Sequence, residues 1–478
     1  MNLHSVLSYI GVILEILGIL ALLPMVVCFI FGEPYYIQFL ITGVVSFALG
    51  SVLDKSFEKD ELDLGSAMVV AAIGFTVVSL LGAIPYFFFL DPLDSLFESV
   101  SGFTTTGLTV MQPEGYPLSL LFWRSFTQWI GGIGIVVIFL LLIASPGISS
   151  YHLYRAEGKT ERIEAGVKHS VKKMFKLYAF YTVLGVILLY IAGMPLFDSV
   201  LNSFTSISTG GFTPKNGSIG AYGNPWIELV IIFLMIVGGT SFFVHSRILR
   251  GSPKNALKTI RERMTEYFQN PETRIFWCIT AIFSVLLTMF FLPQMDAVRH
   301  GIFHTVSAIT TTGYTTLSSL PSGTSMFLLI ILMIVGGYAG STAGGLKLVR
   351  VGVIGKAFVW LARKISLPFE AVIPFRFGSR ILKETELSII SLFVSVYLML
   401  LLISSIIFIL LGYPPMSSFF EVASAQGTVG LTVMDLTVLH WLGKIVLMIN
   451  MLLGRLEIFP FLVLIYGIYR ASFGREKY

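Results

Sequence analysis

The sequence contains apolar segments that are too long to form the core of a soluble domain. The first, "VLSYIGVILEILGILALLPMVVCFIF", runs from Val6 to Phe31 and contains one charged residue. About 20 apolar residues span the hydrocarbon core of a bilayer. The stretch is longer than the apolar core of a signal peptide, and no small-residue cleavage site follows it, so we expect an uncleaved membrane helix. Only 12% of all residues are charged, about half the fraction of an average soluble domain. The chain is therefore predicted to be a polytopic membrane protein.

Ten segments are long and apolar enough to be predicted as spans. They lie near 6–30, 35–53, 64–90, 119–145, 175–195, 226–249, 275–293, 325–350, 386–412 and 438–468. After the first two, the other eight form four pairs, and a segment too polar to span separates the members of each pair. The predicted units are an N-terminal transmembrane hairpin at 1–63 and four repeats at 64–150, 151–252, 253–350 and 351–478.

A short glycine-centred motif ends the polar segment of every pair. It reads "TTTGLTV" at 104–110, "STGGFTP" at 208–214, "TTTGYTT" at 310–316 and "GTVGLTV" at 427–433. The central glycines are Gly107, Gly211, Gly313 and Gly430, spaced by 104 (211 − 107), 102 (313 − 211) and 117 (430 − 313). These spacings are too long for a solenoid repeat. They fit a unit of helix, half-helix, loop and helix that is used four times.

The charge distribution predicts the orientation of these units. Each repeat crosses the membrane twice, so all four motifs lie on one side. Segments 151–176 and 247–274 carry seven Lys or Arg each and 347–383 carries eight, whereas the four motif-bearing segments carry only Lys215 and Arg299. Positive charge marks the cytoplasmic side. We therefore expect the motifs to enter the membrane from outside and the N-terminus to be cytoplasmic.

Four re-entrant loops indicate a pore. Irregular backbone at membrane depth is tolerated where it is buried in protein or lines a water-filled path. Loops around one axis can offer backbone carbonyls in place of an ion's hydration shell, and glycine permits positive φ and close approach of backbones. The partially negative C-terminal ends of the half-helices favour a cation. Eight outer acids are expected to form a cation-attracting vestibule: Asp91, Asp94, Glu98, Glu114, Asp198, Asp296, Glu421 and Asp435. The predicted fold is all-α, with four helix–pore loop–helix repeats around a pseudo-fourfold pore.

These four motifs, each with one filter glycine followed by Leu, Phe or Tyr and then Thr, resemble the Trk/Ktr potassium-uptake superfamily. The two additional N-terminal spans are similar to those of its larger, Trk-type branch. The resemblance implies that potassium contacts the filter glycines and the two residues before each of them: Thr105 and Thr106, Thr209 and Gly210, Thr311 and Thr312, and Thr428 and Val429. Relatives that favour sodium have serine at the first filter position, so Gly107 favours potassium.

The same resemblance implies partners and a location. A member of this superfamily is expected to be a homodimer with one pore per protomer, to lie in the plasma or inner membrane in contact with lipid, and to bind a cytosolic ring of regulatory subunits. Nucleotides of the NAD or ATP type are expected on that ring and not on this chain. Potassium is the expected substrate, with no covalently bound cofactor and no nucleic-acid partner.

A second glycine-rich segment, "VGGYAGSTAGG" at 335–345, lies where the second helix of repeat 3 is expected. Glycine costs about 1 kcal/mol relative to alanine inside a helix, so we expect a break. Arg455 lies in the last span, where a charge marks a functional site. It follows its filter glycine by 25 residues (455 − 430), and the centre of the break follows its own by 25 (338 − 313). We therefore predict a gate made of a flexible loop beside a cationic side chain: Gly336, Gly337, Gly340, Ser341, Thr342, Gly344, Gly345 and Arg455.

Two other functions compete with a potassium pore. A proton- or sodium-coupled potassium symporter on the same scaffold would need intramembrane carboxylates or histidines along a path, and the repeats offer few beyond Glu457. A membrane-embedded hydrolase would have to use His300 and His304, which have no acid between them and explain none of the fourfold register. Channel-like permeation therefore accounts for more of the sequence, and the chain is not expected to be an enzyme.

The remaining unusual membrane residues have structural explanations. Gly131–Gly132 and Gly238–Gly239 are typical of close helix packing, and Glu15 is expected to bond to a neighbouring helix. Lys444 is expected to extend its ammonium group to the outer surface of the membrane. Cys28 and Cys278 are isolated and form no disulfide or metal motif.

Overall fold

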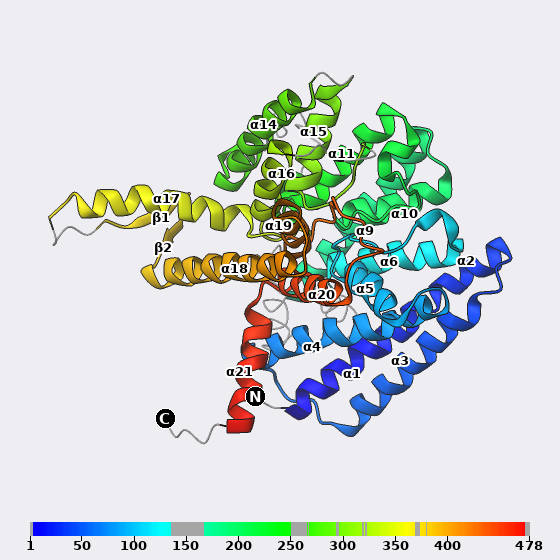
Figure 1. Cartoon of the computed structure of the whole chain (residues 1–478). Coiled ribbons are helices and arrows are strands. Elements are labelled where there is room, and N and C mark those ends of the chain that lie inside the picture. Colours follow the sequence, from blue (N-terminus) through cyan, green and yellow to red (C-terminus); the bar gives the residue numbers. More distant parts are fainter. Residues whose placement is uncertain are drawn as a thin grey trace, which may run out of the picture.

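The computed structural model is almost entirely helical and describes residues 3–134, 167–249, 265, 267–292, 296–317, 320, 323–368, 373–378 and 380–473. An N-terminal hairpin is built from α1 (Leu3–Leu20), α2 (Leu23–Phe31) and α3 (Tyr36–Ser56). It lies along one side of the body, against α4 (Figure 1). Glu15 of α1 accepts a hydrogen bond from Ser51 of α3 at 2.8 Å, as expected. The predicted basic segments 151–176 and 247–274 lie largely outside the described residues.

Four groups of elements follow the hairpin, one for each predicted repeat. The first contains α4 (Leu64–Gly82), η1 (Ile84–Phe88), α5 (Pro92–Phe103), η2 (Pro113–Gly115) and α6 (Leu118–Ile133). The second contains α9 (Val167–Ile191), α10 (Leu196–Ile207), η3 (Ser218–Tyr222), α11 (Pro225–Gly239) and α12 (Phe242–Leu249). The third contains α14 (Pro271–Phe291), α15 (Ala297–Ile309) and α16 (Thr324–Val335), and α17 (Leu348–Ile365) crosses the predicted boundary at 350 into the fourth. The fourth contains α18 (Glu384–Leu410), α19 (Pro415–Gln426), α20 (Trp441–Arg455) and α21 (Phe459–Phe473).

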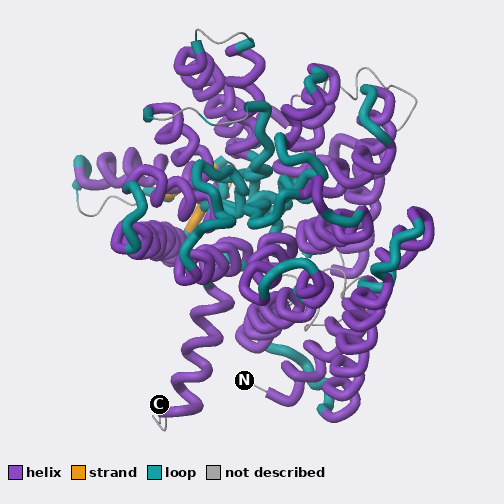
Figure 2. The backbone as a smooth tube through the Cα atoms, turned by 45° about the vertical axis from the view of Figure 1, so that its right-hand side comes forward, coloured by secondary structure: helices purple, strands orange, loops and turns teal. Residues whose placement is uncertain are grey.

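The short helices α5, α10, α15 and α19 are the predicted half-helices. Each ends four residues before a filter glycine, and the loops that follow gather at the centre of the molecule, surrounded by helices (Figure 2). Proline at or next to the first position starts three of them, at Pro92, Pro195 and Pro415, where its missing N–H costs no helical hydrogen bond. The half-helices are buried although they are rich in serine, because they pack around the polar loops.

The second helix is interrupted in repeats 2, 3 and 4, where the sequence predicted spans near 226–249, 325–350 and 438–468. Six helices in the described part of the chain are long and apolar enough to cross a membrane, or up to seven if a bent pair counts as one span. That pair, α20 and α21, bends by 106°. The sequence predicted a break only in repeat 3, between α16 and α17, but α11 and α12 are also separated. Glycines at these ends, such as Gly131 and Gly238, pack against carbonyl oxygens of their own half-helices, so the helices stop where they meet the loops.

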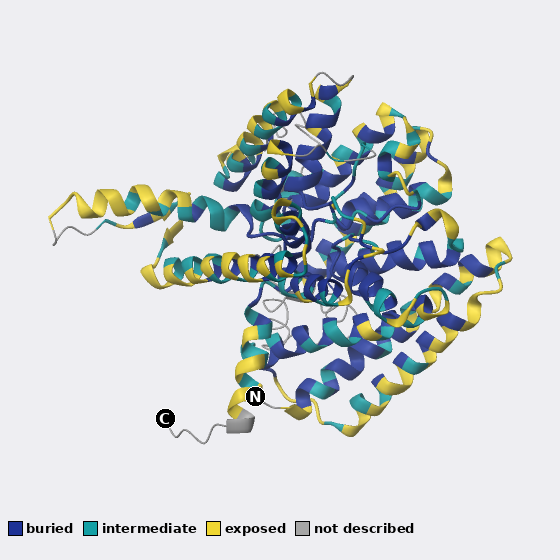
Figure 3. Ribbon diagram, in the orientation of Figure 1, coloured by how far each residue is buried: buried dark blue, intermediate teal, exposed yellow. Residues whose placement is uncertain are grey.

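Packing divides the molecule into two apolar clusters. One joins the N-terminal hairpin mainly to repeats 1 and 2, and the other joins mainly repeats 3 and 4. The outer faces of α3 and α18 carry many exposed apolar side chains, as expected of lipid-facing helices. Figure 3 shows the buried residues concentrated around the central loops. An arm projects from the body (Figure 1) and consists of α17, α18 and an antiparallel pair of strands, β1 (Phe375–Phe377) and β2 (Arg380–Leu382).

Candidate ion pathway

The four filter loops have the same backbone conformation. The threonine two residues before each filter glycine has positive φ, at 54° for Thr105, 52° for Thr209, 54° for Thr311 and 50° for Thr428. The glycines have φ of 87°, 78°, 83° and 91° in chain order. In each loop the N–H of the residue before the glycine bonds to the carbonyl six residues before the glycine, at 2.8–2.9 Å. Non-glycine residues at positive φ are uncommon, so four matching threonines indicate a geometry imposed by the assembled site.

The four loops close into a ring. A Cβ placed on Gly107 would lie 2.1 Å from the carbonyl oxygen of Gly210, and one on Gly211 would lie 1.9 Å from that of Thr312. Going on around the ring, the distances are 1.9 Å from Gly313 to the oxygen of Val429 and 2.3 Å from Gly430 to the oxygen of Thr106. Each filter glycine is thus pressed against the neighbouring loop's carbonyl, in the order 1, 2, 3, 4, 1. Only glycine fits at these four positions, because both φ and the close approach exclude a side chain.

Beneath the ring, the hydroxyls of three of the four positive-φ threonines meet the glycine-rich loop at 336–347. Thr209 donates to the hydroxyl of Thr342 at 3.2 Å, and the N–H of Gly344 donates to Thr311 at 2.7 Å. A Cβ on Gly344 would lie 2.1 Å from the hydroxyl oxygen of Thr428. The filter and the glycine-rich loop are therefore in direct contact.

Arg455 joins the same contact from the end of α20. Its guanidinium donates to the hydroxyl of Thr105 at 3.1 Å and to the carbonyl of Thr342 at 2.8 Å. It also donates to the carbonyls of Gly131 and Gly132 at the end of α6. The sequence placed Arg455 and the glycine-rich segment at one depth, and the structure brings them into hydrogen-bond contact. Their role as a gate stays a prediction.

The glycine-rich loop is anchored on its other side as well. Tyr338 and Thr342 donate their N–H groups to the carbonyls of Gly239 and Gly238, at 3.1 and 3.2 Å. The glycine pair at the end of α11 therefore packs closely, as expected, and also holds the loop. A cavity next to Arg455 is lined by Ser341, Lys347 and Glu457, among others. Glu457 forms an ion pair with Arg350 of α17.

Two of the eight acids predicted to form the vestibule are instead buried behind the loops. Glu98 and Glu421 are fully buried, and each accepts two backbone N–H bonds and one threonine hydroxyl bond from its own filter loop. The expectation failed because the half-helix turns these side chains toward the loop and not toward water. Asp435 is exposed as predicted, and hydrogen bonds from Thr437 hold the pKa of its carboxyl below the ordinary value.

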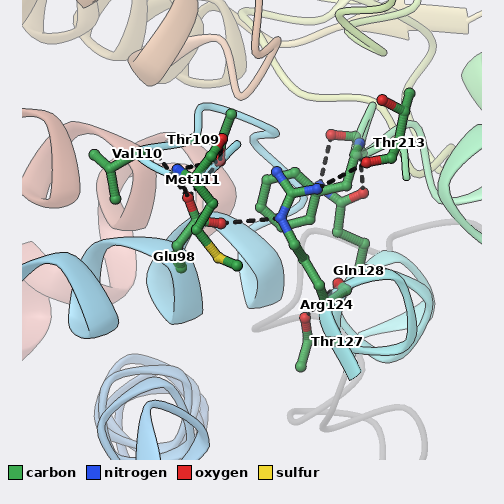
Figure 4. Close-up of polar contacts among 10 residues, drawn as sticks. Glu98, Thr109, Val110, Met111, Arg124, Thr127, Gln128 and Thr213 are labelled. Atoms are coloured by element: carbon green, nitrogen blue, oxygen red, sulfur yellow. Dashed lines mark hydrogen bonds and ion pairs between the residues drawn. The ribbon is translucent and has the colours of Figure 1, made fainter. Parts of the chain in front are cut away.

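A buried arginine that the sequence analysis did not single out links loops 1 and 2. Arg124 of α6, 2% exposed, forms an ion pair with Glu98 at 3.1 Å and donates to the carbonyl of Thr213 at 3.1 Å. Its guanidinium carbon lies 3.5 Å from the centre of the Phe212 ring. Figure 4 shows Arg124 between Glu98 and Thr213, with Gln128 one turn further along the same helix. The sequence feature that could have identified Arg124 is a charged residue inside an apolar helix, which marks a functional site.

Other predicted features have structural explanations. His300 bonds to Thr316, and His304 is buried behind loop 3. No group of three potential metal-binding side chains occurs among residues the structure describes. Lys444 does not extend to the membrane surface: it is buried and forms a 2.6 Å ion pair with Asp94 of repeat 1. A partner 350 residues away cannot be read from the local sequence.

A family model, related sequences and a solved structure all match this chain and agree with one another. A profile of the TrkH family, described as cation transport protein, matches residues 36–468. An uncharacterised cation transporter of Methanocaldococcus jannaschii is 35% identical over 98% of this chain and 96% of its own length. The Trk system potassium uptake protein TrkH of Salmonella typhimurium is 29% identical over the full length of both chains. The crystal structure of the potassium transporter TrkH from Vibrio parahaemolyticus superposes with a TM-score of 0.83 at 26% identity, covering 97% of this chain and 98% of that one.

Proposed function

The chain belongs to the TrkH family of cation transport proteins, and from this premise we propose that it takes up potassium across the cell membrane by channel-like permeation through the four-loop ring. It is a membrane transport protein and not an enzyme. The observation that carries the proposal is the closed cycle of contacts between each filter glycine and its neighbour's carbonyl. This cycle supports the proposal because an ion's hydration shell can be replaced by backbone oxygens that several loops contribute together. The relatives named as potassium uptake proteins support potassium as the cargo.

The proposal includes a gate below the filter. The loop at 336–345 and Arg455 contact the filter threonines directly, and these contacts support a role in controlling the exit from the ring. A guanidinium at this position would repel a permeating cation, since charges interact strongly where the effective dielectric constant is low. Opening would require the loop to leave Thr209 and Thr311 and the carbonyl of Thr342 to leave Arg455.

The wider organisation is proposed on the same basis. The relatives' names place them in a Trk system, which supports a second component for this chain. We propose that this component is a cytosolic ring that binds NAD- or ATP-type nucleotides. We extend the proposal to a homodimer with one pore per protomer, a cytoplasmic N-terminus, and the repeat boundaries given above. Symport remains the alternative.

The test is flux of potassium, rubidium and sodium, each in turn, through purified protein in proteoliposomes. A potassium gradient alone should drive flux, with a reversal potential that follows that gradient. Gly313→Ala should reduce the preference for potassium, because a Cβ there would lie 1.9 Å from a filter carbonyl. Gly412→Ala is the matched control, since Gly412 has a similar φ of 94° but no atom near the Cβ position. Flux that needs a proton or sodium gradient would establish the symporter, and no alkali-cation flux would refute both.

A further inference from the structure

Loop 2 of the filter lacks a side chain that two other loops have at the same position. The residue before the filter glycine is Thr106 in loop 1 and Thr312 in loop 3, and each bonds through its hydroxyl to the threonine two residues earlier, at 2.8 and 2.9 Å. Loop 4 has the buried Val429 there. Loop 2 has Gly210, followed directly by the filter glycine Gly211. Two consecutive glycines give this loop the least restricted backbone of the four.

A side chain from the neighbouring repeat fills the vacant position. A Cβ on Gly210 would lie 2.3 Å from Oε1 and 2.4 Å from Cδ of Gln128, which comes from α6 of repeat 1. No other residue lies among the nearest atoms at that position, and Gly210 has no positive φ that would itself exclude a side chain. The carboxamide of Gln128 therefore occupies the space that a threonine side chain takes in loops 1 and 3.

The carboxamide also makes two hydrogen bonds, one on each side of the filter glycine. Its Nε2 donates to the carbonyl of Gly210 at 2.6 Å, and its Oε1 accepts from the N–H of Phe212 at 3.1 Å. Gln128 is fully buried, so water does not compete for these groups. The two bonds span Gly211 and fix the peptide planes on either side of it. Gly210 supplies the carbonyl that loop 2 contributes to the ring, against Gly107.

The arrangement is confined to this repeat. Gln128 lies three residues before Gly131, which meets the end of its half-helix, and the equivalent contacts of Gly238 and Gly454 place Met235 and Met451 at this position in repeats 2 and 4. In repeat 3, the offset of 21 residues from the filter glycine (128 − 107) gives Ile334. None of these can donate a hydrogen bond to a loop. Arg124, one turn earlier, holds Phe212 and the carbonyl of Thr213. One face of α6 therefore contacts loop 2 at Gly210, Phe212 and Thr213 (Figure 4).

We propose that Gln128 is a specificity-determining positioning residue, which replaces the missing threonine of loop 2 and holds the Gly210 carbonyl at the spacing that potassium requires. Discrimination between cations depends on where the ligating carbonyls lie and how far they can move. Without Gln128, the glycine pair would let the Gly210 carbonyl adapt to a smaller ion. The inference rests on the proposed function, because it assumes permeation through the ring.

The experiment compares potassium-to-sodium permeability ratios in proteoliposomes and records total flux separately. Gln128→Leu preserves volume but removes both hydrogen bonds, and should lower the ratio about three- to tenfold, the effect of one or two such bonds. Gln38→Leu is the matched control, because Gln38 is also buried, at 2% exposure, but lies on α3 of the N-terminal hairpin. Its ratio should equal that of the wild type. A merely structural role for Gln128 would lower flux of all cations together and leave the ratio unchanged.

A reciprocal exchange tests the shared space. Gly210→Thr alone should lower the ratio, because the new side chain collides with Gln128. Combined with Gln128→Ala it should restore the ratio toward wild type, since the introduced hydroxyl can bond to Ser208, which occupies the place of Thr104 and Thr310. This double variant also decides the matter if Gln128→Leu does not fold. Wild-type ratios in folded Gln128→Leu, or a double variant less selective than both single variants, would overturn the proposal. If instead the wild type does not discriminate, or Gly313→Ala changes nothing, the proposed function itself fails.

Discussion

Replacing Arg455 tests whether the contact below the filter is a gate. Its guanidinium contributes in two separable ways: it carries a positive charge, and it fastens the glycine-rich loop through the carbonyl of Thr342 at 2.8 Å. A cation about 6 Å away at an effective dielectric constant of about 20 would be opposed by about 3 kcal/mol, which corresponds to roughly a hundredfold in rate. A hydrogen bond from a charged donor contributes about 1.5–3 kcal/mol. Both effects close the pore, so Arg455→Ala should raise potassium flux.

Three further variants separate the two contributions. Arg455→Lys keeps the charge but cannot reproduce the forked hydrogen bonds of a guanidinium, so its flux should lie between those of wild type and Arg455→Ala. Deletion of residues 340–344 removes Thr342 and should also raise flux. The deletion combined with Arg455→Ala should be less than additive, because both changes relieve one barrier.

The assay is potassium flux in proteoliposomes that contain equal amounts of each variant. Arg455→Ala leaves the carbonyls of Gly131 and Gly132 without this donor, and each unsatisfied buried group costs about 1–3 kcal/mol, so thermal unfolding must accompany every flux measurement. Equal flux in Arg455→Lys and Arg455→Ala would show that the charge is unimportant. Unchanged or lower flux in both Arg455→Ala and the loop deletion, with folding verified, would refute the gate and leave both features as packing elements.

The remaining predictions concern the filter, the gate loop and the outer entrance. Gly107→Ser should weaken the preference for potassium over sodium more than Gly412→Ser does. The two glycines have similar φ, 87° and 94°, but only at Gly107 would the Cβ lie 2.1 Å from a filter carbonyl. Equal permeability ratios in the two variants would show that loop 1 is not part of the filter. Gly344→Ala should raise potassium flux, since its Cβ would lie 2.1 Å from a filter threonine hydroxyl and push the loop away; unchanged flux would mean that the loop does not obstruct the pore. Lys444→Ala should lower the midpoint of thermal unfolding, because it leaves the largely buried Asp94 without the ion-pair partner that lies 2.6 Å away, at a cost of up to about 3 kcal/mol. The double variant Lys444→Ala, Asp94→Ala should recover part of the lost stability. A midpoint equal to that of the wild type in Lys444→Ala would contradict this prediction.

Local sequence determined where the filter loops lie. A filter glycine needs a positive φ that other residues rarely adopt, and a half-helix needs a short amphipathic stretch before it, so both leave a signal within about ten residues. Four copies of the motif in one register then required four equivalent loops. The sequence also predicted that Arg455 and the glycine-rich segment lie close together, because each follows its own filter glycine by the same number of residues. In repeats 3 and 4, residues at the same distance from the filter glycine lie at a similar position relative to the filter.

Contacts between repeats were decided only by the tertiary structure. Gln128 meets Gly210 across 82 residues, and Lys444 meets Asp94 across 350. Nothing near Gly210 in the sequence indicates that a glutamine will fill its missing side chain, and Lys444 alone predicts a side chain that reaches the membrane surface. These contacts between repeats depend on how the four repeats pack around one axis. The sequence of a single repeat does not indicate which residues of a neighbouring repeat it will contact.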